Sequence, residues 1–363
     1  MVTRYPFVWG DSALRAAFPV TIAPEATNRV MKITRIPTLD GWRGIAILLV
    51  LIEHAQKGLF NRVYGGHDWL SLGAHGVTLF FVLSGYLITS RLLDEERIDL
   101  GAFYIRRFFR LMPTAFVYLA FIWLFSWVSG VRYIGSGDTI SCLLFFRNYY
   151  PDAAHSTPFN TFTVHFWSLS VEEQFYLTWP PLLLWVGRKR ALPIAVLGIA
   201  GCALFRIEHW YWSAGIEANI DKLLVGSVLA ILMVETNLRA WLVKFNRILL
   251  PACLVSFVFF IRNFHYVIPL SESIFIGLAI ASTSVKPHSI FARLLDTKLL
   301  SQIGVLSYSL YVWQEFFIVP HWASIGLLLL PLVAVGNWAL IEKPLIARGK
   351  RIIYARRLPA FGA

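Results

Sequence analysis

The chain has 363 residues, of which 57% are hydrophobic and 15% are charged, and its mean hydropathy is +0.61. A soluble domain of this length carries more charge and less apolar surface, so the composition excludes that class and indicates an integral membrane protein. The net charge of +12 is compatible with nucleic-acid binding, but the distribution of the positive residues along the chain indicates membrane topology instead.

The first 35 residues are expected to form a cytoplasmic leader. They are polar, contain three prolines and lack the apolar core of a signal peptide. The three cysteines of the chain are widely spaced in apolar stretches. This pattern favours buried thiols over a metal site or a disulfide framework.

Ten apolar segments follow the leader, and each approaches the roughly 20 residues that a membrane-crossing helix needs. They cover residues 39–59, 70–92, 112–129, 166–186, 191–209, 220–236, 248–261, 270–285, 302–320 and 323–341. With the N-terminus inside, 26 of the 33 Lys and Arg residues face the cytoplasm, as the positive-inside rule requires. We therefore predict an all-α polytopic membrane protein with about ten transmembrane helices and both termini in the cytoplasm. The predicted divisions are a leader at 1–35, a transmembrane domain at 36–344 and a basic cytoplasmic tail at 345–363.

The first predicted span carries Arg43 and His54, which are eleven residues apart. On an α-helix this spacing returns to within about 20° of the same face and separates the two positions by a rise of roughly 16 Å. One helix face thus presents a cation near the cytoplasmic surface and an imidazole in the outer half of the membrane. Alternatively, Arg43 is an interface anchor whose side chain snorkels to the membrane surface, and His54 is a core histidine bonded to a carbonyl.

The second predicted span contains Ser84 before Gly85, and a basic loop with Arg106, Arg107 and Arg110 follows it. A Ser–Gly pair in a membrane helix favours close helix packing over a nucleophilic role. Guanidinium groups match phosphate through paired N–H donors. The same charges also suit a topology signal and anionic lipid headgroups.

A further apolar segment, residues 139–146, is too short to cross the membrane. A crossing there would also invert the charge pattern of every later segment. We expect an outer interfacial or re-entrant helix, followed by a polar outer loop at 148–163.

Two adjacent carboxylates, Glu172 and Glu173, lie near the start of the apolar segment 166–186. A carboxylate inside a membrane span costs roughly 2.5–3.5 kcal/mol, so such groups are rare and functional by default. Glu173 is expected at the same membrane depth as His54. The alternative is a solvated helix end.

Four sequence blocks together resemble the acyltransferase-3 family of integral membrane O-acyltransferases. The blocks are residues 39–44 with His54, residues 80–87, residues 104–113 and residues 167–176. The resemblance extends from about residue 35 to about residue 344. It implies transfer of an acyl group, most often acetyl, from cytoplasmic acyl-CoA to a hydroxyl group, commonly on a sugar.

The resemblance also implies the partners and the location of the protein. Acyl-CoA is a donor substrate, and no permanently bound cofactor, metal or nucleic acid is expected. The acceptor is a glycan or lipid-linked glycan at the cell surface, so the reaction is polysaccharide O-acetylation at a bacterial inner (plasma) membrane, among its lipids. A protein partner is also compatible, because only a short basic stretch follows residue 341 where some family members carry a soluble esterase-like domain.

The resemblance assigns roles to the residues singled out above. His54 is expected to act as the general base, and Glu172 or Glu173 to orient it or stabilise its imidazolium. The acyl-CoA phosphates and arm are expected to bind four arginines: Arg43, Arg106, Arg107 and Arg110.

Five further residues are candidates for lining the pocket: Ser84, His165, Tyr176, Gln314 and Glu315. His165 matches a histidine that often precedes the family's Trp-Ser-Leu element, with an interfacial position as the alternative. The segment 306–314 resembles a late-helix motif that usually ends in histidine, but here the residue is Gln314. An amide cannot titrate, so proton transfer at this position is excluded.

A proton-coupled membrane transporter is the main alternative function, because ten spans with intramembrane Arg, His and Glu also suit a carrier. Against it, the sequence has no two-fold hydropathy repeat, and the charged groups are concentrated in the first and fourth spans. A catalytically silent membrane scaffold is a third alternative, and the retention of Arg43, His54 and the paired glutamates argues against it.

Overall fold

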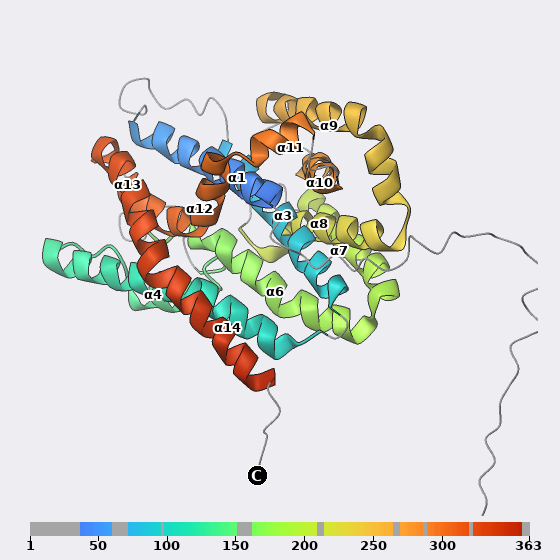
Figure 1. Cartoon of the computed structure of the whole chain (residues 1–363). Helices are drawn as coiled ribbons and strands as arrows, with labels where there is room; N and C mark the ends of the chain where they lie inside the picture. Colours follow the sequence, from blue (N-terminus) through green and yellow to red (C-terminus); the bar gives the residue numbers. More distant parts are fainter. Residues whose placement is uncertain are drawn as a thin grey trace, which may run out of the picture. The chain divides into compact units, whose positions relative to one another are not determined.

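The computed structural model describes the chain in eight stretches: residues 37–59, 72–95, 98–150, 162–208, 214–263, 269–285, 289–318 and 322–357. The chain divides into two units, 1–34 and 35–363, and all described residues belong to the second unit. The predicted leader and both chain termini lie outside the described residues. The described elements are all helical (Figure 1).

Each of the ten predicted apolar segments coincides with a helix. These helices are α1 (Pro37–Leu59), α3 (Leu72–Asp94), α4 (Leu100–Ser129), α6 (Phe166–Val186), α7 (Arg188–Glu208), α8 (Ile220–Glu235), α9 (Leu238–Asn263), α10 (Pro269–Val285), α12 (Lys298–Phe317) and α13 (Ala323–Asn337). The remaining helical elements are α5 (Ser136–Leu143), the 3₁₀ turn η1 (Ile216–Ala218), α11 (Ile290–Leu295), the π-helical turn η2 (Trp338–Glu342) and α14 (Lys343–Arg357).

Fewer helices than predicted meet the length and apolarity expected of a membrane span. Among the described residues four do so: Leu72–Asp94, Leu100–Ser129, Arg188–Glu208 and Ala323–Arg356. Helices α8 and α9 add a fifth only if they form one broken span, because they bend by 113° at their junction. The coarser prediction of an all-α chain with membrane-length apolar helices is confirmed, but about ten such spans are not. Helices α8 and α10 are short, with 16 and 17 residues, and α1 carries four charged residues, Asp40, Arg43, Glu53 and Lys57.

The short segment predicted not to cross is the eight-residue helix α5. Its first turn is closed by Asp138, whose carboxylate accepts a hydrogen bond from the Gly135 backbone N–H at 2.9 Å. Helix α5 packs against the C-terminal part of α4, where the Trp123 indole N–H donates to Thr139 Oγ1 at 2.9 Å. The prediction of a short helix is confirmed, and its side of the membrane stays a prediction.

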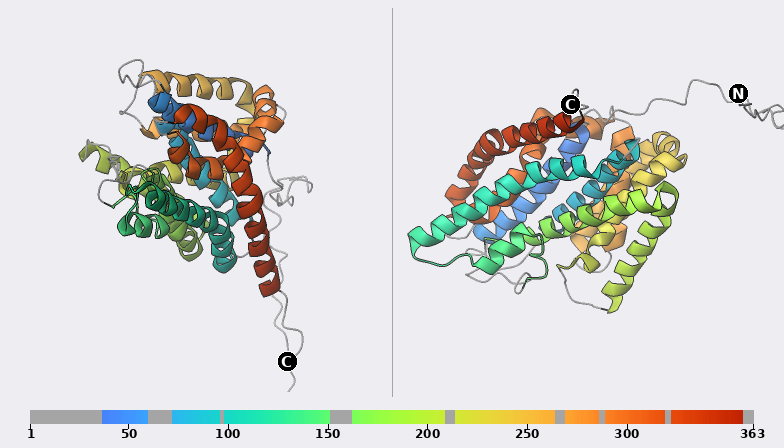
Figure 2. Two further views of the ribbon diagram at one scale, coloured as in Figure 1. Left: turned by 90° about the vertical axis from the view of Figure 1, so that its left-hand side faces the viewer. Right: turned by 90° about the horizontal axis from the view of Figure 1, so that it is seen from below.

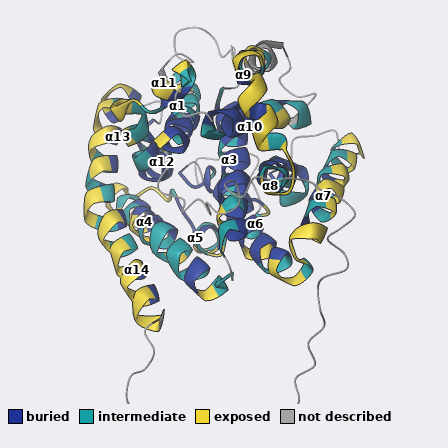
Figure 3. Cartoon of the chain, turned by 45° about the vertical axis from the view of Figure 1, so that its right-hand side comes forward, coloured by how far each residue is buried: buried dark blue, intermediate teal, exposed yellow. Residues whose placement is uncertain are grey.

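Helix α3 lies at the centre of the bundle, between α1 and α8, and is buried over most of its length (Figure 3). Two glycines allow its close approach to α8. A Cβ atom on Gly85 would lie 1.8 Å from the Leu223 carbonyl oxygen, and one on Gly226 would lie 2.0 Å from the Val82 carbonyl oxygen. The Ser–Gly pair of the second predicted span therefore serves helix packing, as expected.

Helix α1 packs against α12 at similarly short range. A Cβ atom on Gly304 of α12 would lie 1.8 Å from the Asp40 carbonyl oxygen. Helix α12 is also joined to α4, because the Tyr308 hydroxyl donates to the Leu111 carbonyl at 2.7 Å. These contacts set the rotation of α1 relative to α12, and this rotation determines which side chains of the two helices meet.

The C-terminal part of the chain is a nearly continuous helical rod of α13, η2 and α14. Helix α14 lies alongside α4 (Figures 1 and 2). The predicted basic tail, 345–363, is thus helical as far as Arg357, and its last residues lie outside the described part of the chain.

The close contact between α3 and α8 predicts a large effect of Gly85→Val. The new side chain would overlap the Leu223 carbonyl, and overpacking of this kind typically costs about 1–3 kcal/mol or more. The midpoint of thermal unfolding in detergent should therefore fall clearly below that of the unchanged protein. Gly201→Val on α7 is the matched control, since a Cβ atom at this position would have no neighbour within 4 Å. Equal midpoints for the two variants would contradict the packing described here.

Candidate functional site

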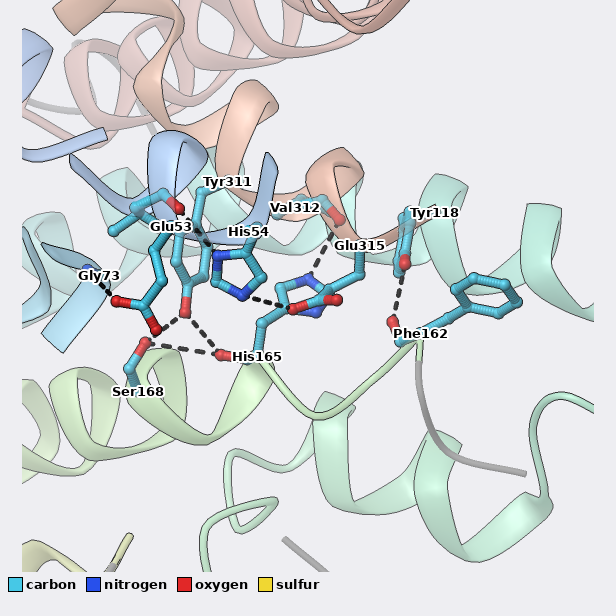
Figure 4. Close-up of polar contacts among 11 residues, drawn as sticks. Glu53, His54, Gly73, Tyr118, Phe162, His165, Ser168, Tyr311, Val312 and Glu315 are labelled. Carbon is cyan, nitrogen blue, oxygen red and sulfur yellow. Dashed lines mark hydrogen bonds and ion pairs between the residues drawn. The ribbon is translucent and has the colours of Figure 1, made fainter. Parts of the chain in front are cut away.

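Helix α1 brings together two groups of polar side chains at its two ends. The histidine cluster consists of His54, His165, Tyr311 and Glu315, and these residues converge from α1, α12 and the start of α6 (Figure 4). The arginine cluster consists of Arg43, Arg91, Arg107 and Arg110, which interact electrostatically with one another. Arg43 and His54 share one face of α1, as the sequence spacing predicted.

Both ring nitrogens of His54 face oxygen acceptors. Nδ1 lies 2.8 Å from the Val50 carbonyl oxygen, and Nε2 lies 3.0 Å from Oε1 of Glu315 on α12 (Figure 4). The Nδ1–H group therefore donates to Val50, which orients the ring, and Glu315 stabilises a proton on Nε2. The His54 side chain keeps 28% of its surface exposed, so a substrate can reach it.

The structure corrects the expected partner of His54. Glu172 and Glu173 lie 3.9 and 4.0 Å from Nη2 of Arg107, farther along α6. The expectation that one of them orients His54 is wrong for this structure, because Glu315 occupies that position. A direct catalytic role for Glu172 and Glu173 stays a prediction.

Arg107 and Glu172 are the centre of a dense set of contacts. The guanidinium carbon of Arg107 lies 3.4 Å from the centroid of the Tyr176 ring. Glu172 accepts hydrogen bonds from the hydroxyl groups of Ser84 and Tyr176. Two buried polar atoms here, Nε of Arg107 and Oε1 of Glu173, make no hydrogen bond. The predicted residues Ser84, Tyr176 and Arg107 are thus brought together, and the two polar atoms without a hydrogen bond can still bind a ligand.

The arginine cluster concentrates positive charge at the other end of α1 from His54. Arg43 pairs with Asp40 at 3.3 Å and also interacts electrostatically with Glu172. Arg106 differs from the other predicted arginines, because its side chain is 38% exposed and pairs with Glu95 at 3.3 Å. Four guanidinium groups gather here, and Nε of Arg107 has no hydrogen-bond partner, so the cluster offers donors that suit the oxygens of a polyanionic ligand.

His165 is buried among neighbouring helices, and its depth in the membrane stays a prediction. Its Nε2–H donates to the Val312 carbonyl at 3.1 Å, and its ring packs edge-on against Tyr311. The Tyr311 hydroxyl donates to the His165 carbonyl at 2.7 Å and lies 2.6 Å from Ser168 Oγ. Gln314 is fully buried, and neither atom of its amide makes a hydrogen bond.

Some of these relationships had a signal in the sequence and others had none. Glu315 was named as a pocket residue, but its contact with His54 was missed, although it is the only carboxylate of α12. Tyr311 and Ser168 lie inside the family-like segments 306–314 and 167–176, but nothing in those segments predicts that the two side chains meet. Within the described stretches, no group of three or more His, Cys, Asp or Glu residues could hold a metal ion.

Comparison with known proteins finds a family model and curated relatives that match most of the chain. A family model described as an acyltransferase domain matches residues 36–341. The O-acetyltransferase OatA of Staphylococcus aureus is 29% identical over 357 residues, covering 86% of this chain and 58% of its own length. The peptidoglycan O-acetyltransferase OatA of Listeria monocytogenes is 27% identical over 312 residues, covering 77% of this chain and 49% of its own length.

The chain therefore spans about half the length of the curated relatives it matches. No solved structure matches the chain. Because the family match includes both clusters and most of the sequence, the chain belongs to the acyltransferase-3 family of membrane acyltransferases.

Proposed function

We propose that the protein is a membrane O-acyltransferase that moves an acyl group, in the first place acetyl, from acyl-CoA to a hydroxyl of a glycan or related exported acceptor. The observation that carries the proposal is the His54 ring, held between the Val50 carbonyl and the Glu315 carboxylate. Family membership favours this activity over the transporter and the scaffold. The names of the relatives support acetyl as the group and peptidoglycan or a similar glycan as the acceptor.

The arginine cluster is the proposed binding site for acyl-CoA. Coenzyme A is polyanionic, and guanidinium groups bind phosphate oxygens through paired N–H donors. Arg43 and His54 are separated by a rise of roughly 16 Å along α1. A donor whose phosphates bind at Arg43, Arg107 and Arg110 can therefore extend its long pantetheine arm, with the thioester at its end, toward His54.

His54 is the proposed general base for the acyl transfer. In the neutral ring, Nδ1 keeps its proton on the Val50 carbonyl and Nε2 presents a lone pair. The acceptor hydroxyl takes the place of the Glu315 oxygen on Nε2. As this hydroxyl attacks the thioester carbonyl, Nε2 takes its proton, and the nearby Glu315 carboxylate stabilises the imidazolium through its charge. The C–S bond then breaks, and the imidazolium returns the proton to the sulfur, so that coenzyme A leaves as a thiol.

The proposed topology retains about ten membrane crossings, including helices such as α1 and α6 that carry charges. This topology is supported by the positive-inside rule, because it places 26 of the 33 Lys and Arg residues on the cytoplasmic side of the membrane. In this arrangement both termini and the arginine cluster are cytoplasmic, and α5 with residues 148–163 is on the outer side. The inner membrane of a bacterium is the proposed location.

The first prediction from the proposed function concerns the base His54 and its partner Glu315. His54→Ala should lower kcat by about 10²–10⁴-fold, the usual contribution of general acid–base catalysis. Glu315→Gln should lower kcat by about 10²–10³-fold, because it removes a charge that stabilises the imidazolium. The donor KM should change little in either variant. Acetyl transfer to an oligosaccharide by purified protein measures both. Glu235→Gln, which removes an exposed carboxylate at the end of α8, is the control. Normal turnover by folded His54→Ala protein would show that His54 is not the general base.

The second prediction concerns donor binding. Arg107→Gln should raise the KM for acyl-CoA with a smaller effect on kcat, because phosphates far from the reacting carbon contribute largely uniform binding. Arg106→Gln should have the same effect to a smaller degree, since Arg106 is more exposed and pairs with Glu95. Lys244→Gln, an exposed cation on α9, is the control. If Arg107→Gln binds donor as tightly as the unchanged protein, the arginine cluster is not the donor site.

The third prediction concerns topology. In a variant without native cysteines, a membrane-impermeant thiol reagent applied to intact cells should label Val131→Cys in the loop between α4 and α5. It should not label Lys189→Cys at the start of α7. Both positions are exposed, and both should react after lysis. The opposite pattern in intact cells would reverse the proposed orientation.

A further inference from the structure

We propose that Arg147 and His165 form a subsite for the acceptor that binds an oxyanion, carboxylate or phosphate, together with a neighbouring hydroxyl. This inference rests on the proposed function. The backbone of Arg147 bonds to Ser170, five residues after His165 on α6, and His165 interacts electrostatically with His54 and Glu315. The acceptor is therefore a glycan that carries a negative charge.

Arg147 is fully buried, and all three nitrogen atoms of its guanidinium group lack a hydrogen bond. Its charge is balanced by Asp138, whose Oδ1 lies 3.6 Å from Nη2, beyond hydrogen-bond distance. A buried polar group without a hydrogen bond is costly, and a buried charge more so. A guanidinium held in this way is prepared to bind an anion through two parallel hydrogen bonds.

The backbone around Arg147 is held rigidly against α6. The Arg147 N–H donates to Ser170 Oγ at 3.2 Å. The amide of Gln174 donates to the Phe145 carbonyl at 2.7 Å and exchanges hydrogen bonds with Asn148. Phe145 has a positive φ of 57°, a conformation that is strained for a bulky residue and that persists only where neighbouring contacts enforce it. Such strain is concentrated at ligand-binding sites.

His165 supplies the second unpartnered atom. Because its Nε2–H donates to the Val312 carbonyl, Nδ1 of the neutral ring carries a lone pair. This nitrogen is buried and makes no hydrogen bond. His165 interacts electrostatically with Arg147 and also with His54 and Glu315. Nδ1 is thus an acceptor for a substrate hydroxyl, next to a cation that suits a substrate oxyanion.

This subsite and the proposed donor site lie near opposite ends of α4. Arg107 and Arg110 are near the start of α4, whereas Arg147 follows α5, which packs beside Trp123 toward the end of α4. On α6, His165 precedes the Glu172–Tyr176 region that contacts Arg107 by a rise of roughly 10–16 Å. Donor and acceptor can therefore approach the base from opposite directions.

Acceptor binding tests the subsite without depending on acyl transfer. The probes are three oligosaccharides of equal length: a neutral N-acetylated one, one with a uronic-acid carboxylate and one with a terminal phosphate. The unchanged protein in detergent should bind at least one of the charged probes about 10- to 100-fold more tightly than the neutral one, the difference expected for hydrogen bonds to a charged group. The charged probe that is preferred identifies the carboxylate or the phosphate as the ligand. Equal affinity for all three would overturn the proposal.

Variants then assign the preference to Arg147. Arg147→Met should abolish the preference for the charged probe and leave binding of the neutral probe and of acyl-CoA unchanged. Lys222→Met, which removes a cation near Asp221 on α8, is the matched control and should keep the preference. A folded Arg147→Met protein that still prefers the charged probe would overturn the subsite. If Arg147→Met does not fold, the probe comparison on the unchanged protein still decides.

The outcome is separable from the proposed function. Charge-selective binding that depends on Arg147, in a protein that transfers no acyl group, would support the subsite and count against the acyltransferase proposal. Acyl transfer with no charge selectivity would support the acyltransferase proposal and count against the subsite.

Discussion

The close packing of α1 against α12 is the contact on which the rest of the site depends. Gly304 allows the backbone of α12 to approach Asp40 of α1, and this approach fixes how the two helices are rotated. One consequence is that Glu315 meets His54 at 3.0 Å instead of facing another helix. A larger residue at position 304 would move α12 away, and the carboxylate would lose contact with the imidazole.

Charge is distributed along α1 in a way that suits two different ligands. The end with Arg43 joins a group of four arginines with several carboxylates among them, whereas the end with His54 holds one imidazole and one carboxylate. Buried charges cost free energy unless they are paired, and the carboxylates near the arginines lower that cost. The proposed phosphate recognition and the proposed proton transfer therefore fall at different positions along α1.

The contacts around Arg107 explain why two adjacent glutamates are needed. Glu172 accepts hydrogen bonds from Ser84 and Tyr176, while Arg107 lies over the Tyr176 ring. Together they join α3, α4 and α6 at one point. These side chains hold the arginine in place between helices, and Glu173 remains with an oxygen that makes no hydrogen bond. The paired carboxylates thus contact the arginine cluster and not His54.

Much of this could be predicted from the sequence by itself, because composition and periodicity are local properties. Apolar segments predicted the positions of the helices, and the spacing of Arg43 and His54 placed both on one helix face. The tertiary structure alone decided that His54 meets Glu315, which is distant in the sequence, and that Arg147 is buried. These contacts depend on the rotation and separation of packed helices, which follow from glycine contacts and side-chain shapes across the bundle. The order of residues along the chain does not specify these contacts, and for the same reason the expectation that Glu172 or Glu173 orients His54 differs from the observed Glu315.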